Sequence, residues 1–176
     1  MNANQPMLPP SIAKPDIDIV RRFLAWAQSA DADARAEGAS ALARAYLHSD
    51  LPEPVRAEAA LAMTALLDDP SALVRRALAE ALCRTTEAPR TLILGLAADE
   101  PEVAAAVLQR SPVLTDADLV DCARTGDVVA QAALARRPNL PPDAAAALAE
   151  IGQRDAVLAL MPISRSIFRR NCLVAS

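Results

Sequence analysis

The second half of the chain repeats one short motif at a spacing of about 26 residues. Ser-Pro-Val-Leu-Thr at residues 111–115 returns as Arg-Pro-Asn-Leu-Pro at residues 137–141, and again as Met-Pro-Ile-Ser at residues 161–164. A unit of this length cannot bury its own apolar face, so neighbouring units must cover one another. The repeat therefore predicts a solenoid of stacked units and excludes a globule built around one central core.

The composition favours helices as the elements of this stack. Hydrophobic residues make up 53% of the 176 residues, and only one Trp, one Tyr and two Phe are among them. Most of the apolar side chains are Ala, Leu and Val, which let helix backbones approach closely, and their spacing is helical along most of the chain. We therefore predict an all-α fold, a right-handed α-solenoid (superhelix) of about five stacked helical pairs.

The predicted organisation is a flexible arm at residues 1–14 followed by a single α-solenoid domain at residues 15–176. Within the domain we expect an N-terminal cap pair at 15–49, longer pairs at 50–110, shorter repeats at 111–163, and a cap or contact helix at 164–176. Helix signals predict starts near residues 15, 50 and 69, and helices at 31–47, 88–98, 100–110, 115–124, 127–136, 142–151, 153–161 and 164–172.

Acidic residues stand where most of these helices begin. A short polar side chain at such a place accepts hydrogen bonds from the unpaired amides of the first helical turn. We therefore expect helix capping, and no acid–base chemistry, from Asp50, Asp69, Asp99, Thr115 with Asp118, and Asp127.

Helical spacing also assigns apolar faces to the first units. Phe23 and Trp26 lie on a stripe of the first helix, as expected where a terminal helix covers the open end of a stack. The faces of the next units consist of Val55, Ala59, Ala62, Met63 and Leu66, followed by Leu73, Val74, Ala77, Leu78, Ala81 and Leu82.

Residues 69–82, Asp-Pro-Ser-Ala-Leu-Val-Arg-Arg-Ala-Leu-Ala-Glu-Ala-Leu, resemble the second helix of a HEAT repeat. In that family an Asp in the turn and an Arg after the Val commonly form a ladder between neighbouring repeats, so the resemblance implies these roles for Asp69 and Arg75. The units at residues 99–104 and 126–130 keep the acid and the Val but lack the Arg. The resemblance therefore implies a ladder that does not continue through the whole stack.

The units after residue 88 are shorter and resemble the leucine-rich repeat variant, which also stacks compact helical pairs into a solenoid. Residues 50–176 as a whole resemble an uncharacterised bacterial domain-of-unknown-function family with HEAT-like repeats (DUF2336-like), found mainly in alphaproteobacteria. The phrases at residues 111–115 and 136–140 carry this second resemblance, which implies no activity.

Charge and segment composition limit the setting of the protein. The formal net charge is −4, so no global field draws the chain to phosphate or to anionic lipid. The N-terminus lacks the basic-then-apolar order of a signal peptide, and no apolar run approaches the roughly 20 residues that span a bilayer. Cys83, Cys122 and Cys172 are odd in number and far apart, as is typical of reduced thiols. We expect a cytoplasmic protein without membrane contact.

Residues for catalysis or metal binding are sparse. His48 is the only histidine, and it stands at a predicted helix end, where an imidazole interacts with exposed carbonyls. The cysteines lack the close pairs of a structural zinc site, and the four glycines stand alone, so no phosphate-binding loop is indicated. We therefore predict that the protein is not an enzyme and holds no cofactor and no metal.

Arginines form the main candidate binding surface. When the repeats are aligned on Pro112 and Pro138, Arg110 coincides with Arg136, and an earlier unit carries arginines in its second helix. Guanidinium groups suit bidentate contacts with carboxylates, and of the 18 basic residues only Lys14 is a lysine. The alternative is that Arg84, Arg110 and Arg136 only offset carbonyls in last helical turns. The candidate partner-binding residues are Arg75, Arg76, Arg110, Arg136 and Arg137.

The C-terminal segment is a second candidate contact. Residues 164–174 combine three arginines with the apolar side chains Ile167, Phe168 and Leu173, which either close the stack or form a self-association site. We predict a non-catalytic interaction or scaffold module that binds an acidic or helical protein segment on its concave face. The alternatives are a nucleic-acid-binding protein like the HEAT-like DNA glycosylases, which the net charge and the few aromatic residues disfavour, and a homodimer through the C-terminal helix.

Overall fold

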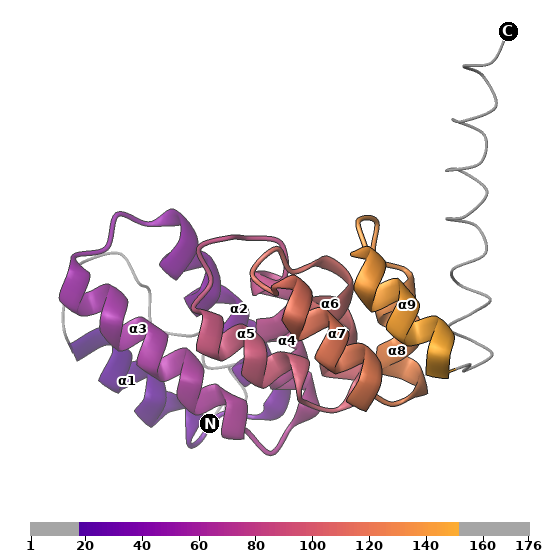
Figure 1. The fold of residues 1–176 in the computed structure, drawn as a ribbon. Helices are drawn as coiled ribbons and strands as arrows, with labels where there is room; N and C mark the ends of the chain where they lie inside the picture. Colours follow the sequence, from indigo (N-terminus) through magenta and orange to yellow (C-terminus); the bar gives the residue numbers. More distant parts are fainter. Residues whose placement is uncertain (1–17, 152–176) are drawn as a thin grey trace, which may run out of the picture.

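The computed structural model describes residues 18–151, and this part of the chain is all-α, as predicted (Figure 1). The predicted helices at 153–161 and 164–172, the arm at 1–14, and Ile167, Phe168 and Leu173 lie outside the described residues. The elements in chain order are α1 (Asp18–Ala27), α2 (Ala32–His48), α3 (Glu53–Ala65), the 3-10 turn η1 (Leu66–Asp68), α4 (Ala72–Leu82), α5 (Arg90–Ala97), α6 (Pro101–Arg110), α7 (Asp116–Thr125), α8 (Val128–Ala135) and α9 (Pro142–Ile151).

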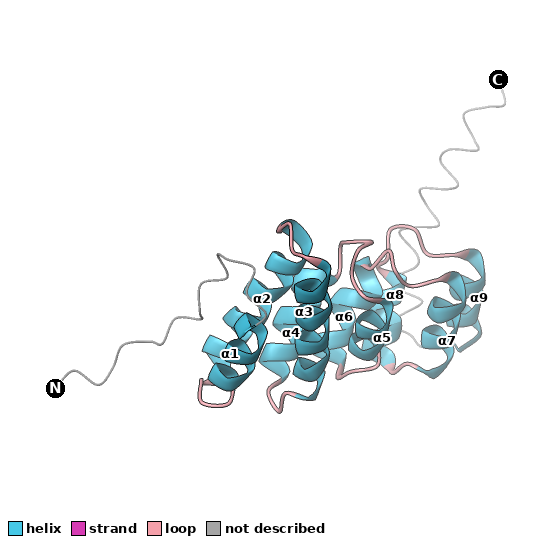
Figure 2. Ribbon diagram, turned by 90° about the vertical axis from the view of Figure 1, so that its left-hand side faces the viewer, coloured by secondary structure: helices cyan, strands magenta, loops and turns pink. Residues whose placement is uncertain are grey.

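The helices form two rows that run in chain order from one end of the described part to the other (Figure 1). Helices α2, α4, α6 and α8 contact one another in succession and make up the α2 row. Helices α1, α3, α5, α7 and α9 make up the α3 row, in which α1 contacts α3 and α7 contacts α9. The connecting loops lie along two opposite edges of the stack (Figure 2). Each pair of helices therefore buries its apolar face against its neighbours.

Small side chains allow the helices of the α2 row to approach closely. The faces between α2 and α4 carry Ala39, Ala43 and Ala79, each without exposed surface. At Gly38 of α2 a Cβ atom would lie 2.7 Å from the ring of Trp26, so only glycine lets the indole pack here without displacement. Phe23 and Trp26 of α1 are buried at 2% and 8% exposure and cover this end of α2.

The predicted apolar faces of the next two units are largely confirmed. The five residues predicted for the first face are all buried, namely Val55, Ala59, Ala62, Met63 and Leu66. In α4, Val74, Leu78 and Leu82 have no exposed surface, whereas Leu73 is 41% exposed. The prediction for Leu73 is wrong because its position is one residue before the buried stripe, and a helix turns by 100° per residue.

Ion pairs join successive helices of the α2 row at their N-terminal ends. The guanidinium of Arg35 on α2 donates to both carboxylate oxygens of Asp69 at 2.8 and 3.0 Å. Arg75 on α4 repeats this arrangement with the next unit, donating from Nε to Asp99 at 2.7 Å and from Nη2 to Glu100 at 2.9 Å. Asp69 and Arg75 thus take part in inter-unit pairs, as the family resemblance implied.

The side chains of both ion pairs are largely buried, unlike those of surface ion pairs. The side chains of Arg75 and Asp99 are 9% and 13% exposed, and those of Arg35 and Asp69 are 16% and 7% exposed. Burial acts to raise the pKa of Asp69, but the hydrogen bond from Arg35 and the other contacts outweigh it and lower that pKa. The hydrogen bond to Asp99 correspondingly raises the pKa of Arg75 against the opposing effect of its burial.

The capping predictions are confirmed for two helices and wrong for three. Thr115 and Asp118 form a capping box at α7, and Asp127 accepts from the amide of Ala130 at α8. The N-cap residues of α3, α4 and α6 are instead Pro52, Ser71 and Glu100, without a side-chain capping bond. Asp69 stands two residues before Ser71, and Asp99 stands one residue before Glu100. Their carboxylates bind the arginines of the preceding helix of the α2 row and accept from the amides of these two N-cap residues.

The α3 row has its own connection between units. Arg90, the first residue of α5, donates to Asp118 of α7 at 2.9 Å and to the carbonyl oxygen of Val113 at 3.2 Å. The hydrogen bond from Arg90 lowers the pKa of Asp118 to about 2, with further lowering by Thr115 and a smaller opposing effect of burial.

None of the helices between Asp18 and Ile151 combines the length and apolar character that crossing a bilayer requires.

Replacing Arg75 by alanine should cost about 3 kcal/mol of the free energy of unfolding, because it leaves the partly buried carboxylate of Asp99 without its partner. Arg76 provides a matched control on the same helix, since its partner between residues 18 and 151 is Glu80 at 3.1 Å and both side chains are about half exposed. Arg76→Ala should cost about 0.5 kcal/mol or less. Urea denaturation followed by circular dichroism measures both, and equal losses would contradict the role of the buried pair.

Acid should weaken the fold partly through Asp118. The folded-state pKa of this residue is lowered to about 2, below that of an aspartate in the unfolded chain. The stability it contributes is therefore complete above roughly pH 4 and is lost as the pH falls towards 2. Denaturant titrations at several pH values should show a smaller loss between pH 4 and pH 2 for Asp118→Asn than for the wild type. Parallel curves for the two proteins would refute this assignment.

Candidate functional site

A pocket of about 490 Å³ lies where α4, α6 and α8 end, and we call it the arginine pocket. No acidic side chain is among the residues that line it. These residues are Arg84, Gln109, Arg110, Pro112, Arg136, Arg137, Pro138 and Asn139.

The repeat explains how these arginines converge. Arg84, Arg110 and Arg136 follow one another at intervals of 26 residues. Arg84 comes directly after the C-cap residue of α4, Arg110 is the last residue of α6, and Arg136 is the C-cap residue of α8. Since these three helices run side by side in one row, their C-terminal ends lie together and line one pocket.

Three of the four guanidinium groups are free for a partner within residues 18–151. Arg84, Arg110 and Arg136 are exposed, and in this part of the chain none of their side chains forms an ion pair or a hydrogen bond. A cation near a helix C-terminus is favoured by roughly 0.3–1 kcal/mol, but several cations around one pocket also repel one another. The pocket therefore carries an excess of positive charge that an anionic group would relieve.

Arg137 has a different part in the pocket. Its guanidinium donates to the carbonyl oxygen of Leu108 at 3.0 Å and to that of Ser111 at 2.6 Å, both at the C-terminal end of α6. Burial lowers the pKa of Arg137, with a smaller opposing effect of Asp116. Arg137 therefore joins the loop after α8 to the end of α6, and it positions the free arginines while adding its charge to the pocket.

The structure brings together three of the five arginines that the sequence indicated for partner binding. Arg110, Arg136 and Arg137 line the pocket, whereas Arg75 and Arg76 lie in the first half of α4 and do not. Arg75 is only 8% exposed, and its guanidinium bonds Asp99, Glu100 and the carbonyl oxygen of Asp69. Arg84 takes their place in the pocket, and its distance of 26 residues from Arg110 is the signal that identifies it.

The other side chains considered for chemistry are dispersed. His48 is the last residue of α2 and is exposed. Cys83 is buried in α4's C-terminal turn, Cys122 is half-buried on α7, and Cys172 lies outside the described residues. Burial, with smaller contributions from Asp118 and Asp121, raises the pKa of Cys122. Between Asp18 and Ile151, no three His, Cys, Asp or Glu residues lie close enough together to hold a metal ion.

Comparison with known proteins identifies a related family for part of the chain. Residues 103–170 match the model of a family described as an uncharacterised protein conserved in bacteria (DUF2336). For this segment the resemblance inferred from the sequence is confirmed, and the segment includes Pro112 and the pocket residues from Arg136 to Asn139. Two further comparisons, one with curated proteins and one with solved structures, found no match.

Neutralising single arginines of the pocket should separate structural from free guanidinium groups. Arg137→Gln loses two charged hydrogen bonds to the end of α6 and should lower the free energy of unfolding by about 2 kcal/mol. Arg136→Gln removes an exposed charge that repels its neighbours and should change that free energy by less than about 0.5 kcal/mol. Urea titrations of both variants provide the measurement. A loss in Arg136→Gln as large as in Arg137→Gln would show that Arg136 also holds the fold together.

Proposed function

We propose that this protein is a non-catalytic interaction module that binds an acidic segment of a protein partner at the arginine pocket. We further propose that its helical pairs are HEAT-like and continue as a right-handed α-solenoid. The observation that carries the functional proposal is the convergence of four arginines on one pocket with no carboxylate in its wall. Helix dipoles favour a cation at each of these helix ends, but the gathering of several cations in one pocket is opposed by their mutual repulsion, which an anionic partner would offset.

The shape of the pocket supports carboxylates of an extended segment as the ligand. Each free guanidinium presents a planar fork of donors that matches a carboxylate in a bidentate contact. Arg84, Arg110 and Arg136 stand at the ends of three successive helices of the α2 row, so they can contact acidic residues spaced along a chain. Gln109 and Asn139 add neutral amides that can bond the backbone of that segment.

The absence of catalysis in this proposal follows from the chemistry of the lining. Arginine, glutamine, asparagine and proline do not ordinarily act as nucleophiles or general bases at neutral pH. His48 stands at the end of α2 and is not among the residues of this pocket. Charge and hydrogen-bonding capacity, which serve recognition, are what the pocket provides.

The two other functions considered from the sequence remain predictions. Guanidinium groups also bind phosphate, so a nucleic acid is the main competitor for this pocket, although the net charge of −4 opposes it. A homodimer through Ile167, Phe168 and Leu173 would use a segment outside the described residues. The experiment on the pocket includes an arm for duplex DNA, because its steep salt dependence distinguishes it from a peptide.

The proposal is tested by comparing the wild type with Arg110→Glu/Arg136→Glu as bait for partners from a nuclease-treated bacterial lysate. Each reversed charge at an interface should cost about 1 kcal/mol or more, so retention of the specific partner should fall at least about tenfold. Quantitative mass spectrometry measures retention. Fluorescence anisotropy with a peptide from the acidic segment of that partner, and with duplex DNA at low salt, then identifies the ligand class.

The matched control is Arg21→Glu/Arg22→Glu, which makes the same change of charge on exposed residues of α1. This control should retain the partner as the wild type does, and circular dichroism should show equal helicity and melting for all three proteins. Equal retention by the pocket variant and the wild type would exclude the arginine pocket as the binding surface. Binding of DNA without binding of an acidic peptide would replace the proposed partner class.

A further inference from the structure

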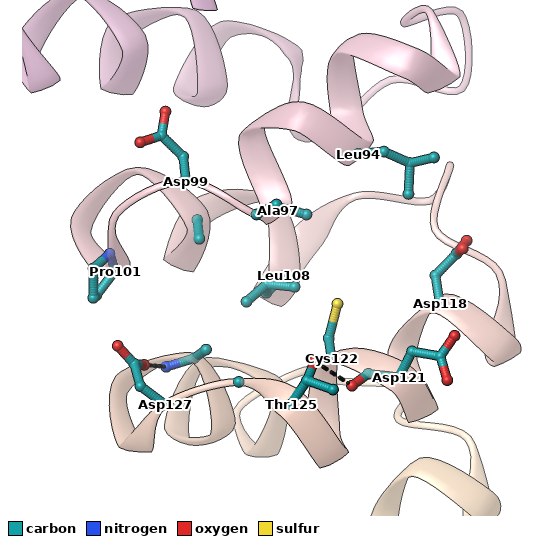
Figure 3. Close-up of a pocket in the computed structure, with 14 residues that line it drawn as sticks. Leu94, Ala97, Asp99, Pro101, Leu108, Asp118, Asp121, Cys122, Thr125 and Asp127 are labelled. Atoms are coloured by element: carbon teal, nitrogen blue, oxygen red, sulfur yellow. Dashed lines mark hydrogen bonds between the residues drawn. The ribbon is translucent and has the colours of Figure 1, made fainter. Parts of the chain in front are cut away.

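A second pocket, of about 500 Å³, lies between the units α5–α6 and α7–α8, and we call it the acidic groove (Figure 3). Its floor and walls are mostly apolar and include Leu94 and Ala97 of α5, Leu108 of α6 and Cys122 of α7. Four aspartates stand at its ends, Asp99 and Asp127 on one side and Asp118 and Asp121 on the other (Figure 3). The groove therefore combines apolar surface with negative charge, opposite to the charge of the arginine pocket.

At the preceding junctions of the α2 row, an arginine side chain occupies the position that corresponds to the Asp99 and Asp127 end of the groove. Arg35 of α2 donates forward to Asp69 of the next unit and back to the carbonyl oxygen of Ala30 in its own turn at 2.8 Å. Arg75 of α4 does the same, forward to Asp99 and back to the carbonyl oxygen of Asp69. At two successive junctions of the α2 row, a guanidinium thus lies between the turns of neighbouring units.

At the third junction this guanidinium is missing. Val74 of α4 and Val103 of α6 are equivalent, since each is fully buried and each opens the buried face of its helix. The residue after Val74 is Arg75, and the residue after Val103 is Ala104. The acid at the next turn is nevertheless present as Asp127, and both Ala104 and Asp127 line the acidic groove. The groove is therefore the place of an inter-unit pair whose arginine α6 does not supply.

Two of the four carboxylates of the groove are free to bind a cation. Asp99 is paired with Arg75, and Asp118 is paired with Arg90. Asp121 and Asp127 are exposed and form no ion pair with any residue between 18 and 151, although Asp127 also caps α8. Burial raises the pKa of the Cys122 thiol, and Asp118 and Asp121 raise it further, so both carboxylates lie near the same wall of the groove.

We propose that the acidic groove binds an arginine side chain presented by a partner protein, together with the apolar residues that flank it. The incoming guanidinium takes the place that Arg75 occupies at the preceding junction and bonds Asp127. The apolar neighbours of that arginine pack on Leu94, Ala97 and the side of Cys122. A volume of about 500 Å³ holds more than a single side chain, which is why the ligand is a segment and not an isolated cation.

This inference is independent of the proposed function of the arginine pocket. Asp127, the carboxylate that the incoming guanidinium bonds, stands at the start of α8, whereas Arg136 of the arginine pocket stands at its end. The arginine pocket attracts acidic residues and the acidic groove attracts basic ones. Variants of one site leave the charges of the other unchanged, and each proposal can fail without the other.

The test uses the full chain labelled with ¹⁵N and two synthetic tripeptides, Ac-Leu-Arg-Leu-NH₂ and its citrulline counterpart. Citrulline has nearly the shape of arginine but no charge, so it reports the contribution of the guanidinium. The arginine peptide should shift the amide signals of Ala104, Asp121, Cys122 and Asp127, with a Kd of about 1 mM, as suits one side chain and two apolar neighbours. The citrulline peptide should bind at least about tenfold more weakly. Equal shifts from both peptides, or none at 10 mM, would overturn the proposal.

Three variants locate the binding. Asp121→Asn/Asp127→Asn should abolish the arginine-specific shifts, and it keeps α8 capped because asparagine is as good an N-cap residue as aspartate. Asp33→Asn/Glu37→Gln removes the same charge from exposed positions of α2 and should bind as the wild type does. Ala104→Arg supplies the missing guanidinium within the chain and should exclude the peptide. Undiminished binding by a folded Ala104→Arg or Asp121→Asn/Asp127→Asn protein would show that arginine does not enter this groove.

Discussion

Each helical pair of this protein is too small to bury its own apolar face, so contact between neighbouring units is the constraint on which the structure depends. The α2 row meets this constraint with alanine and glycine at the closest approaches, as at Ala39, Ala79 and Gly38. Small side chains pack well but leave few features that would stop one unit from sliding along the next. The buried pairs of Arg35 with Asp69 and of Arg75 with Asp99 provide that registration, because a guanidinium and a carboxylate bond well in only one geometry.

The direction of the helices in the α2 row then separates the charges. Every helix of this row starts at one edge of the stack and ends at the other, so the turns that carry acids gather at the first edge and the last residues gather at the second. Helix dipoles favour this arrangement, since acids are stabilised near N-termini and cations near C-termini. At the first edge, Asp31 and Asp127 cap helices, and Asp69 and Asp99 pair with arginines. At the second edge, Arg84, Arg110 and Arg136 form no ion pair with any residue between 18 and 151. The candidate binding site therefore lies at the edge where these arginines remain unpaired.

Interruption of the repeat produces the second site. Ala104 stands where Arg75 stands in the preceding unit, while the acid of the following turn is retained as Asp127. Gln131 of α8 directs its amide back to the carbonyl oxygen of Gly126, much as Arg75 directs a guanidinium back to that of Asp69. The position of Arg75 in α4 thus carries a hydrogen-bonding side chain in α8 as well, whereas in α6 it carries alanine. Comparison of equivalent positions in successive units thus shows that α6 lacks a side chain that α4 carries, and the groove lies at that position.

The sequence by itself determined the helices, their order and most of their buried faces, because spacing, capping residues and proline positions act within a few neighbouring residues. The residues from Val55 to Leu66 and the capping box of Thr115 and Asp118 were predictable for this reason. Only the tertiary structure decided that Asp99 binds an arginine instead of capping α6, that Arg75 is buried while Arg84 joins the pocket, and that Ala104 lines a groove. These outcomes depend on which residues of neighbouring units face one another. The packing of whole helices determines those contacts, and no local sequence pattern does.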